Sequence, residues 1–130
     1  MAKQPLQGCR VLVVEDEYFI ADDVCDWLKK AGASVVGPLS NASRAVESLR
    51  DGGIDVAVID INLGPGPDFE LAAFLTQLRV PFLFATGYGE MAIVAVYANV
   101  PRIEKPFNEG QLLSAVCSLT ERQLYTHCCR

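Results

Sequence analysis

Short apolar runs that are each followed by a polar or charged residue constrain the fold of this chain more than any other feature. Three runs are continuously apolar: residues 11–14 before Glu15 and Asp16, 56–59 before Asp60, and 81–85 before Thr86; a fourth, mixed run at 101–104 precedes Lys105. Continuous apolar runs of this length are typical of strands buried on both faces of a parallel sheet. Ligands bind at the carboxyl ends of such strands, so we expect these polar residues to converge on one site.

Segments with helical spacing alternate with these strands. The expected helices are residues 20–28, closed by Gly32; 45–49, capped by Asn41 or Ser43; 69–78; and a last helix that Asn108 caps and that ends near 119–122. A second, shorter strand is expected at 34–37. The crossover at 90–98 is rich in β-branched residues, which predicts a short or mobile helix there.

This order of elements predicts an α/β fold. We expect a three-layer, doubly wound, flavodoxin-like (βα)5 domain whose parallel sheet has the order 2-1-3-4-5. The 130 residues and the 51% hydrophobic composition suit a single domain with a real core. That domain is expected to span residues 1–122, with its core at about 9–120 and a short tail at 123–130.

Composition excludes several classes of function. A net charge of −5 argues against nucleic acid as a direct ligand, because phosphate binding needs a basic face. No apolar run approaches the roughly 18 residues that span a membrane, and the N-terminus lacks the apolar core of a signal peptide. We expect a cytoplasmic protein. The five cysteines contain no CxxC pair, which disfavours a zinc site. We expect Cys9, Cys25 and Cys117 to act as small hydrophobes.

The residues at the strand ends suit phosphoryl chemistry. In the expected strand order, Glu15 and Asp16 face Asp60, and like charges this close repel unless a cation intervenes. Carboxylates with waters suit Mg²⁺, and a carboxylate beside Mg²⁺ can form an aspartyl phosphate. Lys105 would neutralise charge on the phosphoryl oxygens, and Thr86 could donate its hydroxyl to one of them.

Each of these residues also has a simpler interpretation. The acidic run could be a solvated turn, Asp60 the start of a loop, Thr86 an ordinary strand-end residue and Lys105 a surface lysine. Their joint placement at one edge of one sheet is what favours a site.

Four motifs in these positions resemble the receiver domain of bacterial two-component response regulators. They are residues 14–17 (Val-Glu-Asp-Glu), 58–63 (Val-Ile-Asp-Ile-Asn-Leu), 85–87 (Ala-Thr-Gly) and 104–107 (Glu-Lys-Pro-Phe). The resemblance spans about residues 10–119. Each motif alone is a weak signal, but the four motifs together are specific.

The resemblance implies a role for each site residue. Asp60 is the phosphoacceptor, and Lys105 pairs with the phosphoryl group. Glu15 and Asp16 organise Mg²⁺, with the backbone carbonyl of Asn62 as a further ligand. Thr86 is the switch hydroxyl. In the resembling family the peptide between Lys105 and Pro106 is cis, and we expect a cis bond here.

A finer resemblance concerns residues 84–89, Phe-Ala-Thr-Gly-Tyr-Gly, which look like the signature of the FAT GUY subgroup of receivers. That subgroup is often a stand-alone domain and is usually served by histidine kinases of the HWE or related type. Arg102 occupies the position of the usual aromatic switch residue, and this subgroup also lacks that aromatic residue. We therefore expect the switch to involve Thr86, Gly87 and Tyr88, and phosphorylation to order or move residues 87–98.

Three functions remain open at this point. The first is a phosphorylation-driven switch that takes its phosphoryl group from a sensor histidine kinase and binds an unknown downstream protein. The second is a phosphate sink or relay, and in neither case is the chain a turnover enzyme. The third is a small-molecule phosphotransferase of the haloacid dehalogenase type, which would need Asp-x-Asp after the first strand. The motif Glu15-Asp16-Glu17 disfavours it.

Overall fold

The computed structural model describes residues 4–61, 69–87 and 97–128, with the backbone alone for 121–128. Its five parallel strands have the order β2-β1-β3-β4-β5, which confirms the predicted sheet. The strands are β1 (Arg10–Val14), β2 (Ser34–Leu39), β3 (Val56–Asp60), β4 (Phe82–Thr86) and β5 (Arg102–Glu104). The described helices are α1 (Tyr18–Lys30), α2 (Ala42–Arg50), α3 (Glu70–Leu78) and α4 (Glu109–Cys128).

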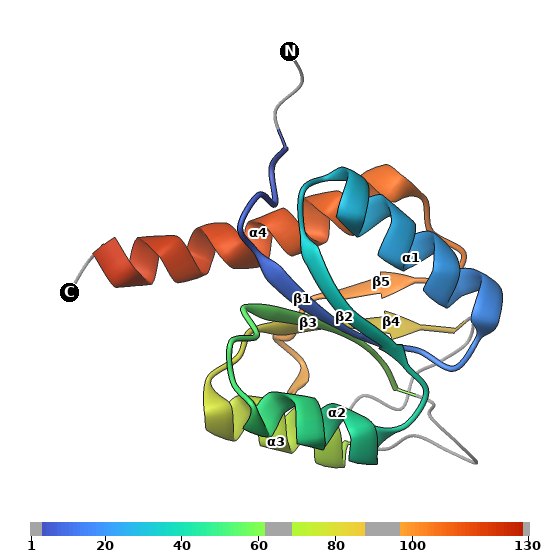
Figure 1. Cartoon of the computed structure of the whole chain (residues 1–130), viewed down its shortest axis with the longest axis horizontal. Coiled ribbons are helices and arrows are strands. Elements are labelled where there is room, and N and C mark those ends of the chain that lie inside the picture. The colour runs from blue at the N-terminus through green and yellow to red at the C-terminus, as the bar shows by residue number, and fades with distance from the viewer. Residues whose placement is uncertain (1–3, 62–68, 88–96, 129–130) are drawn as a thin grey trace.

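Helices cover both faces of the sheet and make it the middle of three layers. α1 and α4 lie on one face, and α2 and α3 lie on the other (Figure 1). Successive strand residues point to opposite faces, so β1 contributes Val11 and Val13 to one apolar cluster and Leu12 and Val14 to the other. Two covered faces explain why the apolar run is continuous instead of alternating.

The helix ends confirm the signals expected in the sequence. Gly32 has φ +99° just beyond α1, a conformation that favours glycine. The Asn41 side chain accepts the Arg44 N–H at 3.0 Å and caps α2. Asn108 and Gln111 each donate a backbone N–H to the other's side-chain oxygen at 2.8 Å, a capping box at the start of α4.

The last helix is longer than the sequence analysis predicts. α4 runs to Cys128 instead of ending near 119–122, so the expected tail at 123–130 is helical through residue 128. Residues 120–128 contain neither glycine nor proline, so nothing interrupts the backbone hydrogen bonds of a helix that is already nucleated. In Figure 1 this end of α4 extends beyond the sheet.

An irregularity in β2 was not expected. The peptide between Gly37 and Pro38 is cis, Gly37 has φ +122°, and the register between β1 and β2 shifts between Leu12 and Val14. A Cβ added at Gly37 would lie 2.6 Å from the Val13 carbonyl oxygen. Glycine is therefore required at this position, where the backbone has a positive φ and lies close to the Val13 carbonyl.

Most of the expected crossover helix at 90–98 lies outside the described residues. Tyr97, at its end, stacks on Phe69 with ring centroids 5.5 Å apart. It also packs edge-on against Phe82 and Phe84. The described part of the crossover is thus held on the face of the sheet that α2 and α3 cover.

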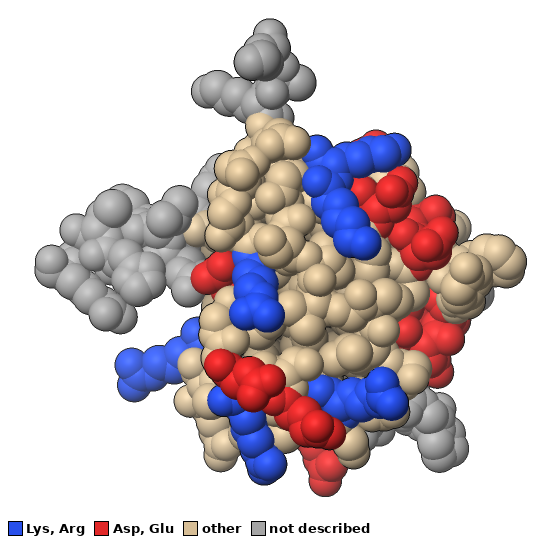
Figure 2. Space-filling model, in the orientation of Figure 1, with Lys and Arg blue, Asp and Glu red and all other residues tan. Residues whose placement is uncertain are grey.

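The described surface mixes charges of both signs. Figure 2 shows basic and acidic side chains interspersed on one face of the molecule, without a continuous basic patch among the residues described there. No helix in the described part of the chain is both long enough and apolar enough to cross a membrane.

Candidate functional site

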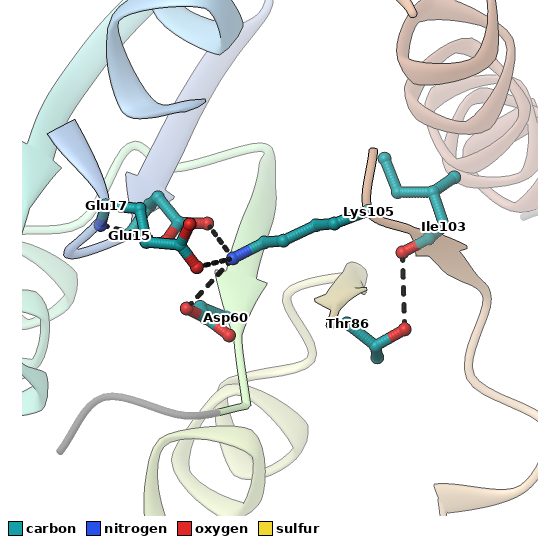
Figure 3. A network of polar contacts seen from close by, with 6 residues as sticks. All are labelled: Glu15, Glu17, Asp60, Thr86, Ile103 and Lys105. Atoms are coloured by element: carbon teal, nitrogen blue, oxygen red, sulfur yellow. Dashed lines mark hydrogen bonds and ion pairs between the residues drawn. The ribbon is translucent and has the colours of Figure 1, made fainter. Parts of the chain in front are cut away.

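The carboxyl ends of four neighbouring strands bring the expected polar residues to one edge of the sheet. Glu15 and Asp16 follow β1, Asp60 ends β3, Thr86 ends β4 and Lys105 follows β5. These strands are successive neighbours, so their ends meet although they are far apart in the sequence (Figure 3). The peptide after Lys105 is cis, as expected.

The ammonium group of Lys105 lies at the centre of the site. Its Nζ is 2.9 Å from Glu15 Oε1, 3.0 Å from Glu17 Oε1 and 3.2 Å from Asp60 Oδ2 (Figure 3). The Glu15 and Asp60 side chains are only 4% and 3% exposed, and Lys105 is 9% exposed. Burying a charge is costly unless it is paired, so these three groups depend on one another.

Burial and the neighbouring charges shift the pKa values of Glu15 and Lys105. Burial is the main cause that raises the pKa of Glu15 to about 7; the hydrogen bond from Lys105 opposes this rise, and the negative charge of Asp60 adds to it. Burial lowers the pKa of Lys105, but hydrogen bonds to Glu15 and Glu17 and the nearby carboxylate charges outweigh burial and raise it. Lys105 is therefore a cation at neutral pH, and a further cation would relieve the repulsion between Glu15 and Asp60.

Three carboxylates at this edge fit a divalent cation. Glu15, Asp16 and Asp60 each offer an oxygen, and these oxygens lie within 4.8 Å of one another. Two of the groups are buried and Asp16 is exposed, so the set opens toward solvent. Hard oxygen donors at an open edge suit Mg²⁺, which keeps several of its waters. The expected further ligand, Asn62, lies outside the described residues.

The expected switch residues are only partly covered by the structure. Thr86 is buried at the end of β4, and its hydroxyl faces the Ile103 carbonyl oxygen at 3.5 Å, turned toward β5 (Figure 3). Arg102 is exposed on β5, and Gly87 directly follows Thr86. Tyr88 lies outside the described residues. The hydroxyl thus lies at the correct edge of the sheet but is directed away from the carboxylates.

Glu17 is the site residue that the sequence analysis missed. In the sequence it belongs to a run of three acidic residues, and such runs usually face water. In the structure its carboxylate contacts Lys105, although the side chain is 58% exposed. One signal in the sequence could have indicated this contact. Glu17 directly follows Glu15 and Asp16, and Lys105 is the one lysine expected at the same edge of the sheet.

Comparison with known protein families shows to which family this chain belongs. Residues 11–117 match the family model described as the response regulator receiver domain. The chain belongs to this family. The matched segment contains every residue of the site described above, from Glu15 to Lys105.

Individual relatives agree with this assignment. The chemotaxis protein CheY of Bacillus subtilis (strain 168) is 31% identical over 113 residues, which cover 82% of this chain and 93% of CheY. The sensory transduction protein LytT of Bacillus cereus is 29% identical over 111 residues, and these cover 82% of this chain but only 45% of LytT. The BeF3-activated conformation of SdrG from Pseudomonas melonis Fr1 is similar with a TM-score of 0.76 and 30% identity, covering 92% of this chain and 99% of SdrG.

Proposed function

We propose that Asp60 accepts a phosphoryl group from a sensor histidine kinase, with Mg²⁺ bound beside it, and that the chain signals by changing a protein-binding surface. The observation that carries this proposal is the 3.2 Å contact between Lys105 Nζ and Asp60 Oδ2. It lies at the strand edge where Glu15 and Asp16 add two further carboxylates. A nucleophile, a cation for the phosphoryl oxygens and ligands for a metal are therefore within reach of one another.

The transfer follows from these groups. An Asp60 oxygen attacks the phosphorus of a phosphohistidine, and an O–P bond forms as the P–N bond breaks; the electron pair of that bond stays on the imidazole nitrogen, which takes up a proton. Lys105 presents its charge to the incoming phosphoryl oxygens. Asp16 and Asp60, with Glu15 nearby, would hold Mg²⁺, whose charge offsets that of the same oxygens.

The likeness to SdrG supports this chemistry. SdrG is described in a BeF3-activated conformation, and beryllofluoride mimics a phosphoryl group on a carboxylate. We expect the corresponding edge of this chain to bind the same mimic at Asp60. Because the phosphoryl group stays on Asp60 until it is hydrolysed or passed on, the chain acts as a phosphoacceptor and not as a turnover enzyme.

Thr86 is the proposed link between phosphorylation and the surface. The new phosphoryl oxygens attract its hydroxyl, which then leaves the weak 3.5 Å contact with the Ile103 carbonyl. This movement pulls on Gly87 and the residues after it, so residues 87–98 and β5 form the partner surface. Arg102 is exposed there and takes the place of an aromatic switch.

We further propose that the chain belongs to the FAT GUY subgroup and that a kinase of the HWE or related type is its phosphodonor. The assignment rests on the sequence Phe-Ala-Thr-Gly-Tyr-Gly together with Arg102.

The proposal is tested by phosphorylation with acetyl phosphate, followed by intact-protein mass spectrometry. Wild type with Mg²⁺ should gain one phosphoryl group, whereas Asp60→Asn and wild type in EDTA should gain none. Asp51→Asn makes the same change at an exposed carboxylate beyond the end of α2 and should label as wild type does. Wild-type labelling of Asp60→Asn would overturn the assignment of the phosphoacceptor.

A further inference from the structure

The three carboxylates that hold Lys105 differ sharply in burial. Glu15 and Asp60 are 4% and 3% exposed, whereas Glu17 is 58% exposed. A lysine ammonium has three N–H donors, and the three contacts at 2.9, 3.0 and 3.2 Å account for all of them. Phosphorylation turns Asp60 into an acyl phosphate, so one phosphoryl oxygen takes over the contact of Asp60 with Lys105. A second phosphoryl oxygen can bind Lys105 only by displacing Glu15 or Glu17 (Figure 3).

Glu17 is the carboxylate that leaves at least cost. Releasing Glu15 from Lys105 would take the nearest cation away from a buried carboxylate, which is strongly unfavourable. A released Glu17 turns into water, and exposed ion pairs contribute little to stability. Glu17 is also the N-cap residue of α1 but makes no capping hydrogen bond with its side chain, so its release breaks no helix cap.

We propose that Glu17 is the displaceable counter-ion of Lys105 and that a phosphoryl group on Asp60 takes its place. This inference rests on the proposed function of Asp60. In the unphosphorylated protein Glu17 occupies the third donor of Lys105, which lowers the affinity of the site for a phosphoryl group. After phosphorylation the carboxylate is expelled from the site.

Expulsion of Glu17 alters the surface where α1 begins. The next two residues, Tyr18 and Phe19, are 74% and 80% exposed. Their rings form an edge-on pair with centroids 5.4 Å apart. The released carboxylate turns into water directly before this aromatic pair in the chain, so the charge next to the two exposed rings changes. The start of α1 thus becomes a second element that responds to phosphorylation, separate from the segment after Thr86.

The affinity for beryllofluoride tests the displacement. Trp27 is the only tryptophan of the chain, and it lines the same cavity of about 370 Å³ as Glu17 and Lys105, so its fluorescence can report binding in the presence of Mg²⁺. Glu17→Gln keeps the shape but removes the competing charge. We expect it to bind beryllofluoride about two- to fivefold more tightly than wild type, the range that an exposed ion pair supports.

A matched control separates displacement from a general charge effect. Asp23 is an exposed carboxylate that lines the same cavity, and Asp23→Asn should bind as wild type does. Equal affinity of wild type and Glu17→Gln would overturn the inference, as would an equal gain in Asp23→Asn. A wild-type protein that binds no beryllofluoride would instead refute the proposed function of Asp60.

Amide NMR signals supply a readout that does not depend on affinity. Beryllofluoride should shift the wild-type signals of residues 17–19. In unliganded Glu17→Gln the same signals should already lie part of the way toward the bound positions, and in unliganded Asp23→Asn they should not. Signals of residues 17–19 that do not move when wild type binds the mimic would show that Glu17 stays on Lys105.

Discussion

Replacing Glu15 by glutamine should stabilise the Mg²⁺-free protein at alkaline pH, although Glu15 belongs to the proposed metal site. Its carboxylate is almost fully buried beside the like charge of Asp60, and Lys105 only partly compensates for this. Glutamine has the shape of the protonated acid and can still accept the hydrogen bond from Lys105. The change therefore isolates the cost of the negative charge.

The raised pKa gives the size and sign of the effect. The pKa of Glu15 rises from 4.5 to about 7, chiefly through burial. Between these values the folded protein holds a proton that the unfolded chain has released, so the free energy of unfolding falls as pH rises. Each pKa unit corresponds to about 1.4 kcal/mol, so the charged Glu15 side chain costs about 3 kcal/mol above pH 7. Below pH 4.5 the cost disappears.

Urea unfolding in EDTA between pH 4 and pH 8 measures this cost. The advantage of Glu15→Gln over wild type should grow by about 3 kcal/mol from the acidic to the alkaline end. Glu47→Gln, an exposed carboxylate on α2, is the matched control, and its difference from wild type should stay small throughout, as surface changes usually do. Parallel pH profiles for wild type and Glu15→Gln would refute the reasoning, because they would mean that burial does not penalise the charged form.

Three further outcomes are expected. Asp16→Ala should weaken Mg²⁺ binding by about tenfold or more, followed by Trp27 fluorescence, because it removes the exposed member of the carboxylate set; an unchanged titration would contradict the metal site. Gly37→Ala should lower the free energy of unfolding by about 1–3 kcal/mol, and by more than Gly52→Ala, because Gly52 also has positive φ but open space for a Cβ; equal losses would mean that the contact with the Val13 carbonyl is relieved. Burial raises the pKa of Cys9 to about 11. In a background in which the other four cysteines are replaced, its thiol should therefore react with a disulfide reagent at pH 8 far more slowly than in urea; equal rates would disprove the burial effect.

The strand order and most of the site were predictable because both depend on local patterns. A run such as 56–59 can be buried on both sides only in a covered sheet, and the polar residue after it must then lie at the sheet edge. The sequence alone therefore predicts that Asp60 lies beside Glu15 and Lys105. Asn41 and Asn108 were predictable caps for the same reason, since a cap acts within one turn of its helix.

Other features depend on contacts between residues far apart in the sequence, or on how far a helix continues, and a single sequence does not show these. Glu17 looked like a solvated charge, and only the reach of Lys105 across the sheet edge makes it a member of the site. The close approach of Gly37 to Val13 depends on the register between two strands. The length of α4 was underestimated because the apolar pattern ends near Leu119, whereas helix continuation needs only the absence of a breaker.

The most direct test of the account is to locate the phosphoryl group chemically. Borohydride reduces an acyl phosphate to an alcohol, so a phosphorylated aspartate becomes homoserine and can be found by peptide mass spectrometry. After treatment with acetyl phosphate and Mg²⁺, we expect homoserine at position 60 and at no other aspartate, and none when Mg²⁺ is removed. Homoserine at position 16, or at position 60 in equal yield without Mg²⁺, would contradict the roles assigned to Asp60 and to the carboxylates around it.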